Sequence, residues 1–423
     1  MKLISDLHVT ITNNQFPLLV DEVYKTGCEV LSLQHVGSQG DKDDYIVQVL
    51  YKDIDRLKQA YGNLNKYKNY FKITSIANTL ENKLKGGLLR VVTSNEVKSD
   101  SDYELNIEGA QVIIEEKIKN QKGYEFSSIS RSVGLIYLMK EKDVFLQQDV
   151  LTLFSRAERD AAVLSLFADV NPVPQVITFT QMEDVVKTLS RIQYNFSVIK
   201  IMDIEEGDIF VYDQITKTLD VPVVSHLLDE EPFYILTVIN KLMQKNSIDL
   251  TSATFGFLGI DISTLRLTRL LERMGCHRVL GYDNNDRMML GFENQGGLGT
   301  TAENIFSNAD VVIIFKDNFT SVDLDKIRPG QFVISFVERD DINGEAMQSR
   351  GVREFIEKRK NDILKISPGF IKGIMEHSVQ QIDPGFIIKA AEYLSGFIEE
   401  DYSFGGLFSE IHQQISDSMK NQQ

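Results

Sequence analysis

A glycine turn, a helical pattern and a later aspartate form the part of the sequence best suited to chemistry. An apolar run ends at Gly259, a helical pattern follows, and the next apolar run stops just before Asp283. This layout is typical of a βαβ unit in which the turn approaches a pyrophosphate, the helix N-terminus faces it and the acid binds a ribose hydroxyl. The pattern therefore indicates a dinucleotide-binding unit, with Gly259 and Asp283 as candidate cofactor contacts.

Two of the glycines that such a turn normally contains are replaced here, by Asp261 and Thr264. The second glycine lets the backbone approach the pyrophosphate, and the third lets the helix pack closely on the strand. We expect Asp261 at the helix N-terminus, where its carboxylate competes with a phosphate for the free N–H groups and repels it. NAD binding is left open, because Gly259 can serve the turn alone and Asp283 can simply begin a surface turn.

Regularly spaced apolar runs supply the elements that would hold this unit. After residue 250 these runs are Thr254–Leu258, Arg278–Tyr282, Val311–Phe315 and Phe332–Phe336. Their alternation with helical or turn segments predicts a Rossmann-like, doubly wound parallel sheet with helices on both faces. Asp383 and Pro384 begin a further helix that extends to about Glu399, with Asp383 as its N-cap, and we expect it to pack on the neighbouring domain. Gly291–Gly299 has no strand running into it, and we expect a mobile loop there.

The first eighty residues follow a different order of elements. Alternating and helical patterns predict the order βαββαβ, which makes a four-stranded antiparallel, ferredoxin-like sheet with two helices on one face. Val9–Asn14, the helix after it and then Gly27–Val30 resemble the start of an ACT domain, a regulatory module that often pairs its sheet with a partner subunit. That family usually opens its first helix with a glycine that admits an effector. The Phe16-Pro17 pair at this place favours a dimerising role over effector binding.

The length and composition of the chain limit its class. A chain of 423 residues exceeds one ordinary core, and we divide it into an ACT-like domain at 1–80, a linker at 81–100, a mixed α/β domain at 101–250 and a Rossmann-like domain at 251–423. A formal net charge of −16 at pH 7 argues against nucleic acid or an anionic membrane as a partner. Cys28 and Cys276 lie too far apart in sequence to indicate a disulfide framework or a zinc site. With no signal-peptide core and no long apolar run, we expect a cytoplasmic protein.

Three further segments occur in the order found in one enzyme family. They are Val221–His226, Ala309–Ile314 and Ile366–Gly373. The first resembles the stretch in malic enzymes that carries a metal-binding aspartate, the second a strand lining the cofactor site, and the third a Phe-Pro-Gly turn and its helix. Malic enzymes oxidise and decarboxylate malate with a nicotinamide cofactor and a divalent metal. The resemblance therefore implies a substrate and metal domain at 101–250 and an NAD-binding type of domain at 251–423.

The same resemblance marks where the family's reactive residues fall in this chain. The paired metal-binding acids fall on Met202 and Asp203, and the third falls on Leu227, which leaves Asp203 as the candidate metal ligand. Thioether and alkyl groups cannot replace the oxygen ligands that Mg²⁺ and Mn²⁺ require. The catalytic lysine aligns with Asp160, and the tyrosine acid falls near Asn106.

These replacements favour a malic-enzyme-like protein that has lost catalysis. We expect such a pseudoenzyme to act as a regulatory or partner subunit or as a ligand sensor, assembled as a homo-oligomer through the ACT-like domain or with a malic-enzyme paralogue. The alternative is an NAD(P)-dependent, oxaloacetate-decarboxylating malate dehydrogenase of altered specificity. A divalent metal is not expected. Asp229, Glu230 and Glu231 offer carboxylates that could replace the lost metal ligands, but we interpret these three residues as surface acids at a helix start.

Overall fold

The computed structural model describes most of the chain, namely residues 3–12, 15–39, 42–52, 54–77, 98–99, 107–108, 111–112, 115, 127–141, 147–202, 209–358, 365–406 and 409–420. Asn106 and Asp203 lie outside these described residues, as does most of the predicted linker at 81–100. The chain falls into two units, Met1–Val92 and Thr93–Gln423. Among the described residues, no helix is both long and apolar enough to cross a membrane.

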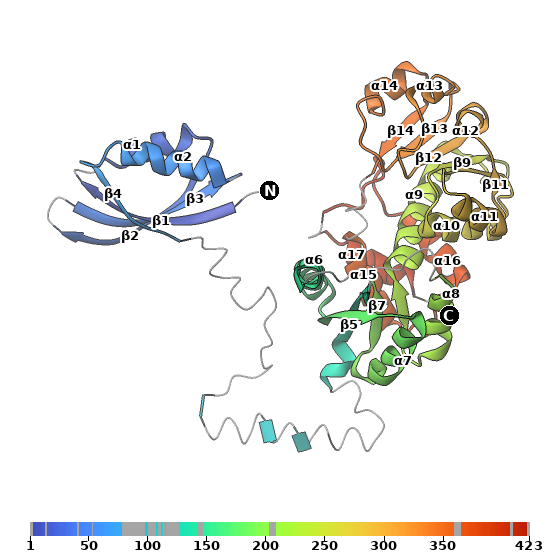
Figure 1. Cartoon of the computed structure of the whole chain (residues 1–423), viewed down its shortest axis with the longest axis horizontal. Coiled ribbons are helices and arrows are strands. Elements are labelled where there is room, and N and C mark those ends of the chain that lie inside the picture. The colour runs from blue at the N-terminus through green and yellow to red at the C-terminus, as the bar shows by residue number, and fades with distance from the viewer. Residues whose placement is uncertain are drawn as a thin grey trace. The chain divides into compact units, whose positions relative to one another are not determined.

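The N-terminal unit is an antiparallel sheet covered on one face by two helices (Figure 1). Its elements are β1 (Leu3–Thr12), α1 (Phe16–Tyr24), β2 (Glu29–Gln39), β3 (Lys42–Tyr51), α2 (Ile54–Asn65) and β4 (Phe71–Ala77). The strand order is β2-β3-β1-β4, so the predicted βαββαβ arrangement is confirmed. Leu7, Val9 and Ile11 alternate along β1 and are buried in the core of this unit, because successive side chains of a strand point to opposite faces.

A parallel sheet of order β6-β5-β7-β8 begins the second unit. Its elements are β5 (Ser132–Lys140), α6 (Gln147–Ala168), β6 (Asn171–Phe179), α7 (Met182–Ile192), β7 (Val198–Ile201), α8 (Ile209–Thr218) and β8 (Val223–Ser225). A π-helical turn, η7 (His226–Glu230), then leads directly into α9 (Glu231–Asn246). Ile199 and Ile201 of β7 are fully buried and belong to one core cluster on a face of the sheet. Lys200, between them, therefore points to the opposite face.

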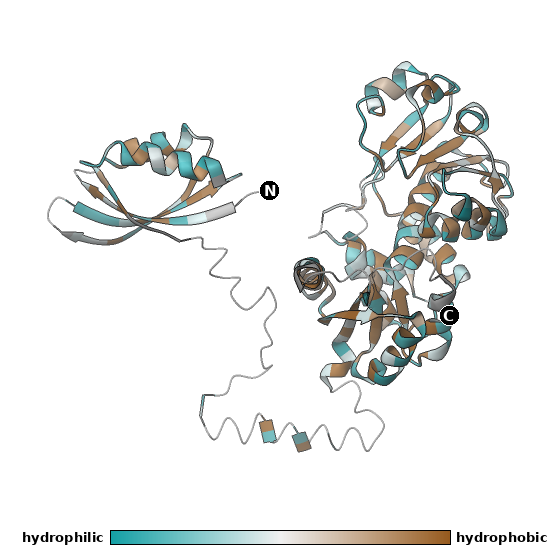
Figure 2. Ribbon diagram, viewed as in Figure 1, coloured by the Kyte–Doolittle hydropathy of each residue, from teal (hydrophilic) through white to brown (hydrophobic). Residues whose placement is uncertain are grey.

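A second parallel sheet, of order β11-β10-β9-β12-β13-β14, confirms the predicted Rossmann-like arrangement. Its strands are β9 (Phe255–Leu258), β10 (Val279–Tyr282), β11 (Leu298–Gly299), β12 (Val311–Ile314), β13 (Phe332–Ser335) and β14 (Glu354–Glu357). The helices between them are α10 (Ile262–Arg273), α11 (Asp286–Asn294), α12 (Ala302–Asn308), α13 (Ser321–Leu324) and α14 (Gly344–Ser349). Most strands of both parallel sheets are brown in Figure 2, as expected for strands that are buried on both faces.

The prediction of a loop at Gly291–Gly299 is wrong. The segment contains the end of α11, a turn and the short strand β11, which pairs in parallel with β10. Gly281 and Gly297 both face the ring of Phe292, and a Cβ on either glycine would come within 2.3 Å of that ring. The glycines are therefore needed for close packing beneath an aromatic side chain.

The chain ends in three helices that return to other parts of the second unit. They are α15 (Ser367–Glu376), α16 (Pro384–Ser395) and α17 (Ile411–Ser418). Asp383 caps α16 as predicted, because its Oδ1 accepts a 2.8 Å hydrogen bond from the N–H of Phe386. Helix α15 packs against α6 and β7, and α16 packs against α9. The first turn of α15 is thereby placed beside the face of the sheet to which Lys200 points.

Candidate functional site

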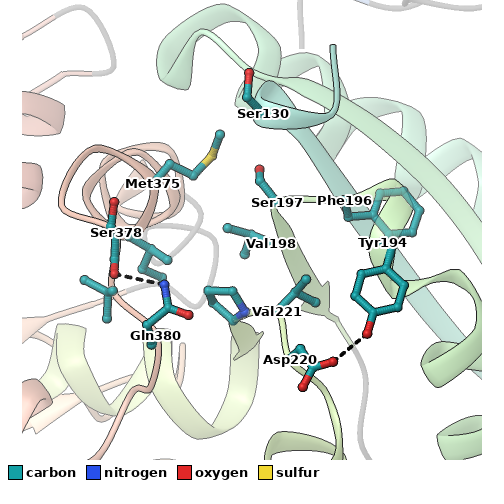
Figure 3. Close-up of a pocket in the computed structure, with 13 residues that line it drawn as sticks. Ser130, Tyr194, Phe196, Ser197, Val198, Asp220, Val221, Met375, Ser378 and Gln380 are labelled. Atoms are coloured by element: carbon teal, nitrogen blue, oxygen red, sulfur yellow. Dashed lines mark hydrogen bonds between the residues drawn. The ribbon is translucent and has the colours of Figure 1, made fainter. Parts of the chain in front are cut away.

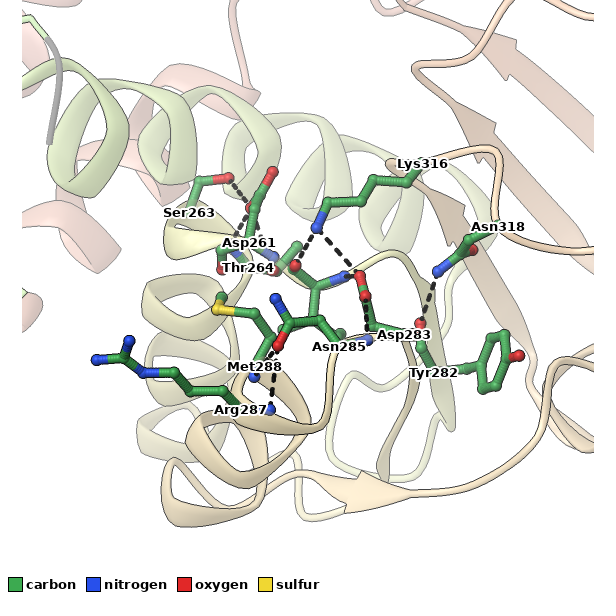
Figure 4. Close-up of polar contacts among 11 residues, drawn as sticks. Asp261, Ser263, Thr264, Tyr282, Asp283, Asn285, Arg287, Met288, Lys316 and Asn318 are labelled. Carbon is green, nitrogen blue, oxygen red and sulfur yellow. Dashed lines mark hydrogen bonds and ion pairs between the residues drawn. The ribbon is translucent and has the colours of Figure 1, made fainter. Parts of the chain in front are cut away.

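The predicted dinucleotide turn is present at the carboxyl end of β9 (Figure 4). Gly259 has a φ of 89°, and a Cβ there would lie 2.7 Å from the backbone nitrogen of Lys316. Only glycine fits this left-handed position and this close approach of two strand ends. The N–H of Gly259 donates to the carbonyl of Tyr282, with an N–O distance of 2.9 Å. Gly259 is therefore needed by the fold itself, whether or not a cofactor binds.

Asp261 and Thr264, the two residues that replace glycines of the dinucleotide turn, bind each other at the start of α10. Asp261 is the N-cap, and its Oδ1 accepts hydrogen bonds from the N–H of Thr264 at 3.0 Å and from the hydroxyl of Ser263 at 2.8 Å. In return, Thr264 Oγ1 accepts a 2.6 Å bond from the N–H of Asp261. This reciprocal capping box satisfies N–H groups that a pyrophosphate would otherwise use. The placement expected for Asp261 is thus found, with Thr264 as its partner.

Asp283 lies beside the same turn, and both of its carboxylate oxygens already have protein donors. Oδ2 accepts from the N–H of Ile260 at 2.7 Å and from Lys316 Nζ at 3.1 Å, while Oδ1 accepts from the N–H of Asn285 at 2.9 Å. Lys316 also donates to the carbonyl of Ile260. Lys316 was not predicted from the sequence, although a lysine two residues after a buried strand, at the carboxyl edge of a sheet, is a usable signal.

Asp261→Gly is expected to bind NAD several-fold more tightly than the wild-type chain. The change removes a carboxylate from the positive end of the helix and frees the Thr264 N–H, whereas glycine as an N-cap costs only a few tenths of a kcal/mol. Isothermal titration with NAD measures the effect. Asp383→Gly, which removes a capping carboxylate from α16, is the matched control. If neither Asp261→Gly nor the wild type binds NAD, the turn serves only the fold.

A buried ion pair lies on the face of the first parallel sheet that α6 and α15 cover. Lys200 Nζ is 2.8 Å from both carboxylate oxygens of Glu230, and the two residues are 1% and 0% exposed. Ser367 Oγ donates to Glu230 Oε1 at 2.8 Å and also contacts Lys200 Nζ. His226 Nδ1 lies 2.9 Å from Glu230 Oε2. Although burial alone would raise the pKa of Glu230, the cation of Lys200 and the contact with His226 hold it below its ordinary value.

Asp229, the neighbour of Glu230, is buried in a different environment. Its Oδ2 accepts a 2.7 Å bond from the N–H of Ser225 and a further bond from the hydroxyl of Tyr212. Its closest cation is Arg266, with 3.8 Å between Arg266 Nη2 and Asp229 Oδ1. Burial raises the pKa of Asp229 to about 6, against the opposing effects of Arg266, the Ser225 N–H and Tyr212.

The interpretation of Asp229, Glu230 and Glu231 as surface acids is therefore wrong. All three are buried, with exposed fractions of 0%, 0% and 3%. The π-helical turn η7 carries Asp229 and Glu230 inward before α9 begins. Lys200 was also missed, but a single lysine within the apolar strand Val198–Ile201 signals a buried carboxylate partner, because an unpaired buried cation is too costly.

Asp160, at the position aligned with the family's catalytic lysine, is also buried and bonded. Its Oδ2 accepts from the hydroxyl of Tyr137 at 2.6 Å, and its Oδ1 accepts from Arg159 Nε at 2.8 Å. Asp160, Lys200 and Ser367 line one cavity of only about 10 Å³. A space of this size holds a single water molecule at most, so no substrate fits between these side chains as they stand.

The described residues at this place do not fit a divalent metal. Met202 is buried, and Leu227 packs against the core cluster beside it. Both oxygens of Glu230 and Oδ2 of Asp229 already have donors from the protein, and Asp229 Oδ1, which accepts no hydrogen bond, faces the cation of Arg266 at 3.8 Å. Within the described part of the chain, no three His, Cys, Asp or Glu side chains are grouped so as to share a metal. Asp203, the predicted ligand, lies outside the described residues.

A cavity of about 310 Å³ lies near the opposite edge of the same sheet (Figure 3). It is lined by residues at the amino ends of β7 and β8 and at the end of α15, among them Ser197, Pro222 and Met375. On one side, Tyr194 donates to Asp220 Oδ2 at 2.6 Å. Open α/β sheets bind their ligands at the carboxyl ends of the strands, so this cavity is not at the expected place for a substrate.

Comparisons with known proteins agree with this architecture. No family model matches the chain. NAD-dependent malic enzyme 1 of Bacillus subtilis is 22% identical over 271 residues, which span 62% of this chain and 61% of that protein. The malic enzyme of Pyrococcus horikoshii has a TM-score of 0.67 at 16% identity, covering 79% of this chain and 86% of that one. The NAD-dependent malic enzyme of Thermotoga maritima also has a TM-score of 0.67, at 15% identity and covering 82% and 99%. The chain is therefore malic enzyme-like in sequence and fold, while the ACT resemblance of its N-terminal unit stays a prediction.

Proposed function

We propose that this malic-enzyme-like protein does not oxidise malate and acts instead as a regulatory or partner subunit or as a ligand sensor. The observation that carries the proposal is the buried pair of Lys200 and Glu230. Lys200 lies two residues before Met202, and Glu230 lies three residues after Leu227, which are two of the three positions where the family resemblance puts metal-binding acids. The ammonium group of Lys200 thus belongs to the segment from which the reaction needs ligands for a metal ion.

Malate oxidation followed by decarboxylation makes two demands that these side chains do not meet. A metal must polarise the hydroxyl oxygen and then the enolate oxygen, and a base must accept a proton. The carboxylate of Asp160 is engaged by Tyr137 and Arg159, and the small cavity beside it leaves no room for a substrate hydroxyl. The ammonium group of Lys200 is paired and fully enclosed. These contacts support a structural role for the former catalytic region.

A second candidate is an NAD(P)-dependent oxidoreductase of altered specificity. It is favoured by the dinucleotide turn, in which Gly259, Ile260 and Asp283 keep the close contacts of a phosphate-binding loop. The names of the Bacillus and Thermotoga relatives carry NAD, which makes it the first cofactor to test. The capping box of Asp261 argues against tight binding.

The test is an assay of the purified full-length chain with malate, Mn²⁺ and either NAD or NADP, following formation of the reduced cofactor. We expect no malate-dependent reduction, while the Bacillus relative under the same conditions provides the positive control. Reduction that persists after repurification and disappears in Asp160→Asn would contradict the proposal and support the oxidoreductase. Titration calorimetry with NAD alone then shows whether the turn retains a cofactor without turnover.

We also propose that the N-terminal unit mediates self-association through β2. This strand lies at the edge of its sheet, and among the described strands it pairs only with β3. Leu31, Leu33 and Val36 are 46%, 37% and 61% exposed. A long edge strand with exposed apolar residues favours pairing with another strand. Val36→Lys is expected to convert an oligomer into monomers in light scattering, whereas Leu166→Lys, at an exposed position of α6, should have no effect. A wild-type chain that is already monomeric would contradict this proposal.

A further inference from the structure

A cavity of about 350 Å³ lies between α8, α10 and α11, in the second unit. It is separate from the buried pair of Lys200 and Glu230, since neither residue lines it, and Asp261 and Asp283 of the dinucleotide turn do not line it either. Small-molecule sites of proteins begin at about this size. The cavity is thus a distinct place where a ligand fits.

Three arginines line this cavity, in a chain that carries far more acids than bases. Arg266 and Arg269 lie three residues apart on one face of α10, and Arg287 comes from the first turn of α11. Asp213 of α8 is the one acid among the lining residues that the structure describes. Such a concentration of cations runs against a net charge of −16, and indicates a local preference for an anion.

The charges of these arginines are poorly satisfied within the described part of the chain. Arg266 has a side chain only 15% exposed, its Nε is buried without a hydrogen-bond acceptor, and its closest acid is Asp229 at 3.8 Å. No described acid lies within ion-pair distance of Arg269 or Arg287. A guanidinium group carries five N–H donors in a planar fork that matches phosphate and carboxylate oxygens. The arrangement lacks the acceptors that a bound oxyanion would supply.

Besides the arginines, the cavity is lined by the polar residues Asp213, Asn294 and Gln295 and by an apolar surface. Leu228 comes from η7, Ile262 and Leu265 from α10, and Met288 from α11. All four of these side chains are buried. A bare inorganic anion would leave this surface without a partner, whereas a ligand with a carbon skeleton or ring beside its charged group would cover it.

We propose that this cavity binds a small organic phosphate. The phosphate oxygens accept from Arg266, Arg269 and Arg287, and the organic part lies on Leu265 and Met288. A phosphate is favoured over a single carboxylate because three guanidinium groups match a dianion with three free oxygens. The site goes beyond the proposed loss of malate chemistry and does not depend on it.

The test is titration calorimetry of the full-length chain with phenyl phosphate, inorganic phosphate and benzoate in parallel. Phenyl phosphate combines both features of the proposed ligand, and each of the other probes lacks one. We expect phenyl phosphate to bind one site per chain with a dissociation constant of about a millimolar or below, and the other two probes to bind at least several-fold more weakly. Added NaCl should weaken the binding of phenyl phosphate.

Arg269→Gln combined with Arg287→Gln is expected to weaken the binding of phenyl phosphate at least tenfold. Both side chains are exposed, so the double variant should keep its fold, which circular dichroism checks. Arg273→Gln, on α10 but outside the cavity lining, is the matched control and should bind like the wild type. The absence of saturable binding of phenyl phosphate, an unchanged affinity in the double variant, or tighter binding of benzoate would each overturn the proposal.

Discussion

Lys200→Met is expected to lower the free energy of unfolding by about 3 to 5 kcal/mol near neutral pH. Methionine keeps much of the length of the lysine chain but removes the cation that lies 2.8 Å from both oxygens of Glu230. Glu230 is 0% exposed, so its negative charge would remain without a balancing cation. Removing one partner of a buried pair costs far more than the pair itself contributes, because the remaining charge stays desolvated.

Urea unfolding followed by circular dichroism measures this effect, since the chain has no tryptophan to report by fluorescence. Lys241→Met is the matched control. Lys241 pairs at 2.9 Å with Glu400, whose side chain is 76% exposed, and exposed pairs of this kind contribute less than about 1 kcal/mol. Lys200→Met combined with Glu230→Gln should recover much of the loss, because no buried charge is left. A double variant as unstable as Lys200→Met would show that packing, and not charge, dominates at this place.

The direction of the pH dependence separates the wild type from Lys200→Met. In the wild type, the pKa of Glu230 is held below its ordinary value of 4.5, so the pair stabilises the fold above that pH, and the contribution is lost as the pH falls further. In Lys200→Met, burial without the cation raises the pKa of Glu230. The variant is then expected to approach the wild type in stability as the pH falls from 7 towards 5.

Local patterns were sufficient to predict much of the second parallel sheet and its turn. The strand ending at Leu258, the glycine turn and the helix beginning after Asp261 follow from neighbouring residues in the sequence. Asp261 caps α10 because a carboxylate at a helix start accepts from free N–H groups, whatever the rest of the chain does. Asp383 at the start of α16 was predicted for the same reason.

The buried ion pair could not be predicted in this way, because its partners are far apart in the sequence. Lys200 and Glu230 are 30 residues apart, and Ser367 is 167 residues from Lys200. Three consecutive acids before an apolar helix are typical of an exposed first turn. Here the π-helical turn changes the direction of the side chains, and a lysine of β7 compensates their charge. The position of Asp229 and Glu230 was therefore decided by tertiary contacts and not by local preference.

Asp229→Asn is expected to gain stability relative to the wild type as the pH rises from 4 to 8. The free energy of unfolding of the variant, minus that of the wild type, should increase over this range by an amount on the order of 3 kcal/mol. Burial raises the pKa of Asp229 from 3.8 to about 6. The folded state therefore holds this proton more strongly than the unfolded state does. A group of this kind favours folding below the unfolded pKa, and the advantage is lost as the pH rises from about 4 through about 6.

Asparagine retains the polar contacts of this position and removes the ionisation. Its carboxamide oxygen can accept from the Ser225 N–H and the Tyr212 hydroxyl, as Asp229 Oδ2 does. Urea unfolding between pH 4 and pH 8 gives the measurement. Glu230→Gln is the control, and its stability relative to the wild type should change with pH in the opposite direction, because the lowered pKa of Glu230 stabilises the wild type at the higher pH. Parallel pH profiles for the wild type and Asp229→Asn would mean that Asp229 ionises as readily in the fold as in water. That result would require Arg266, 3.8 Å away, to offset the whole cost of burying the carboxylate, and would leave less of its positive charge for an anion in the arginine-lined cavity.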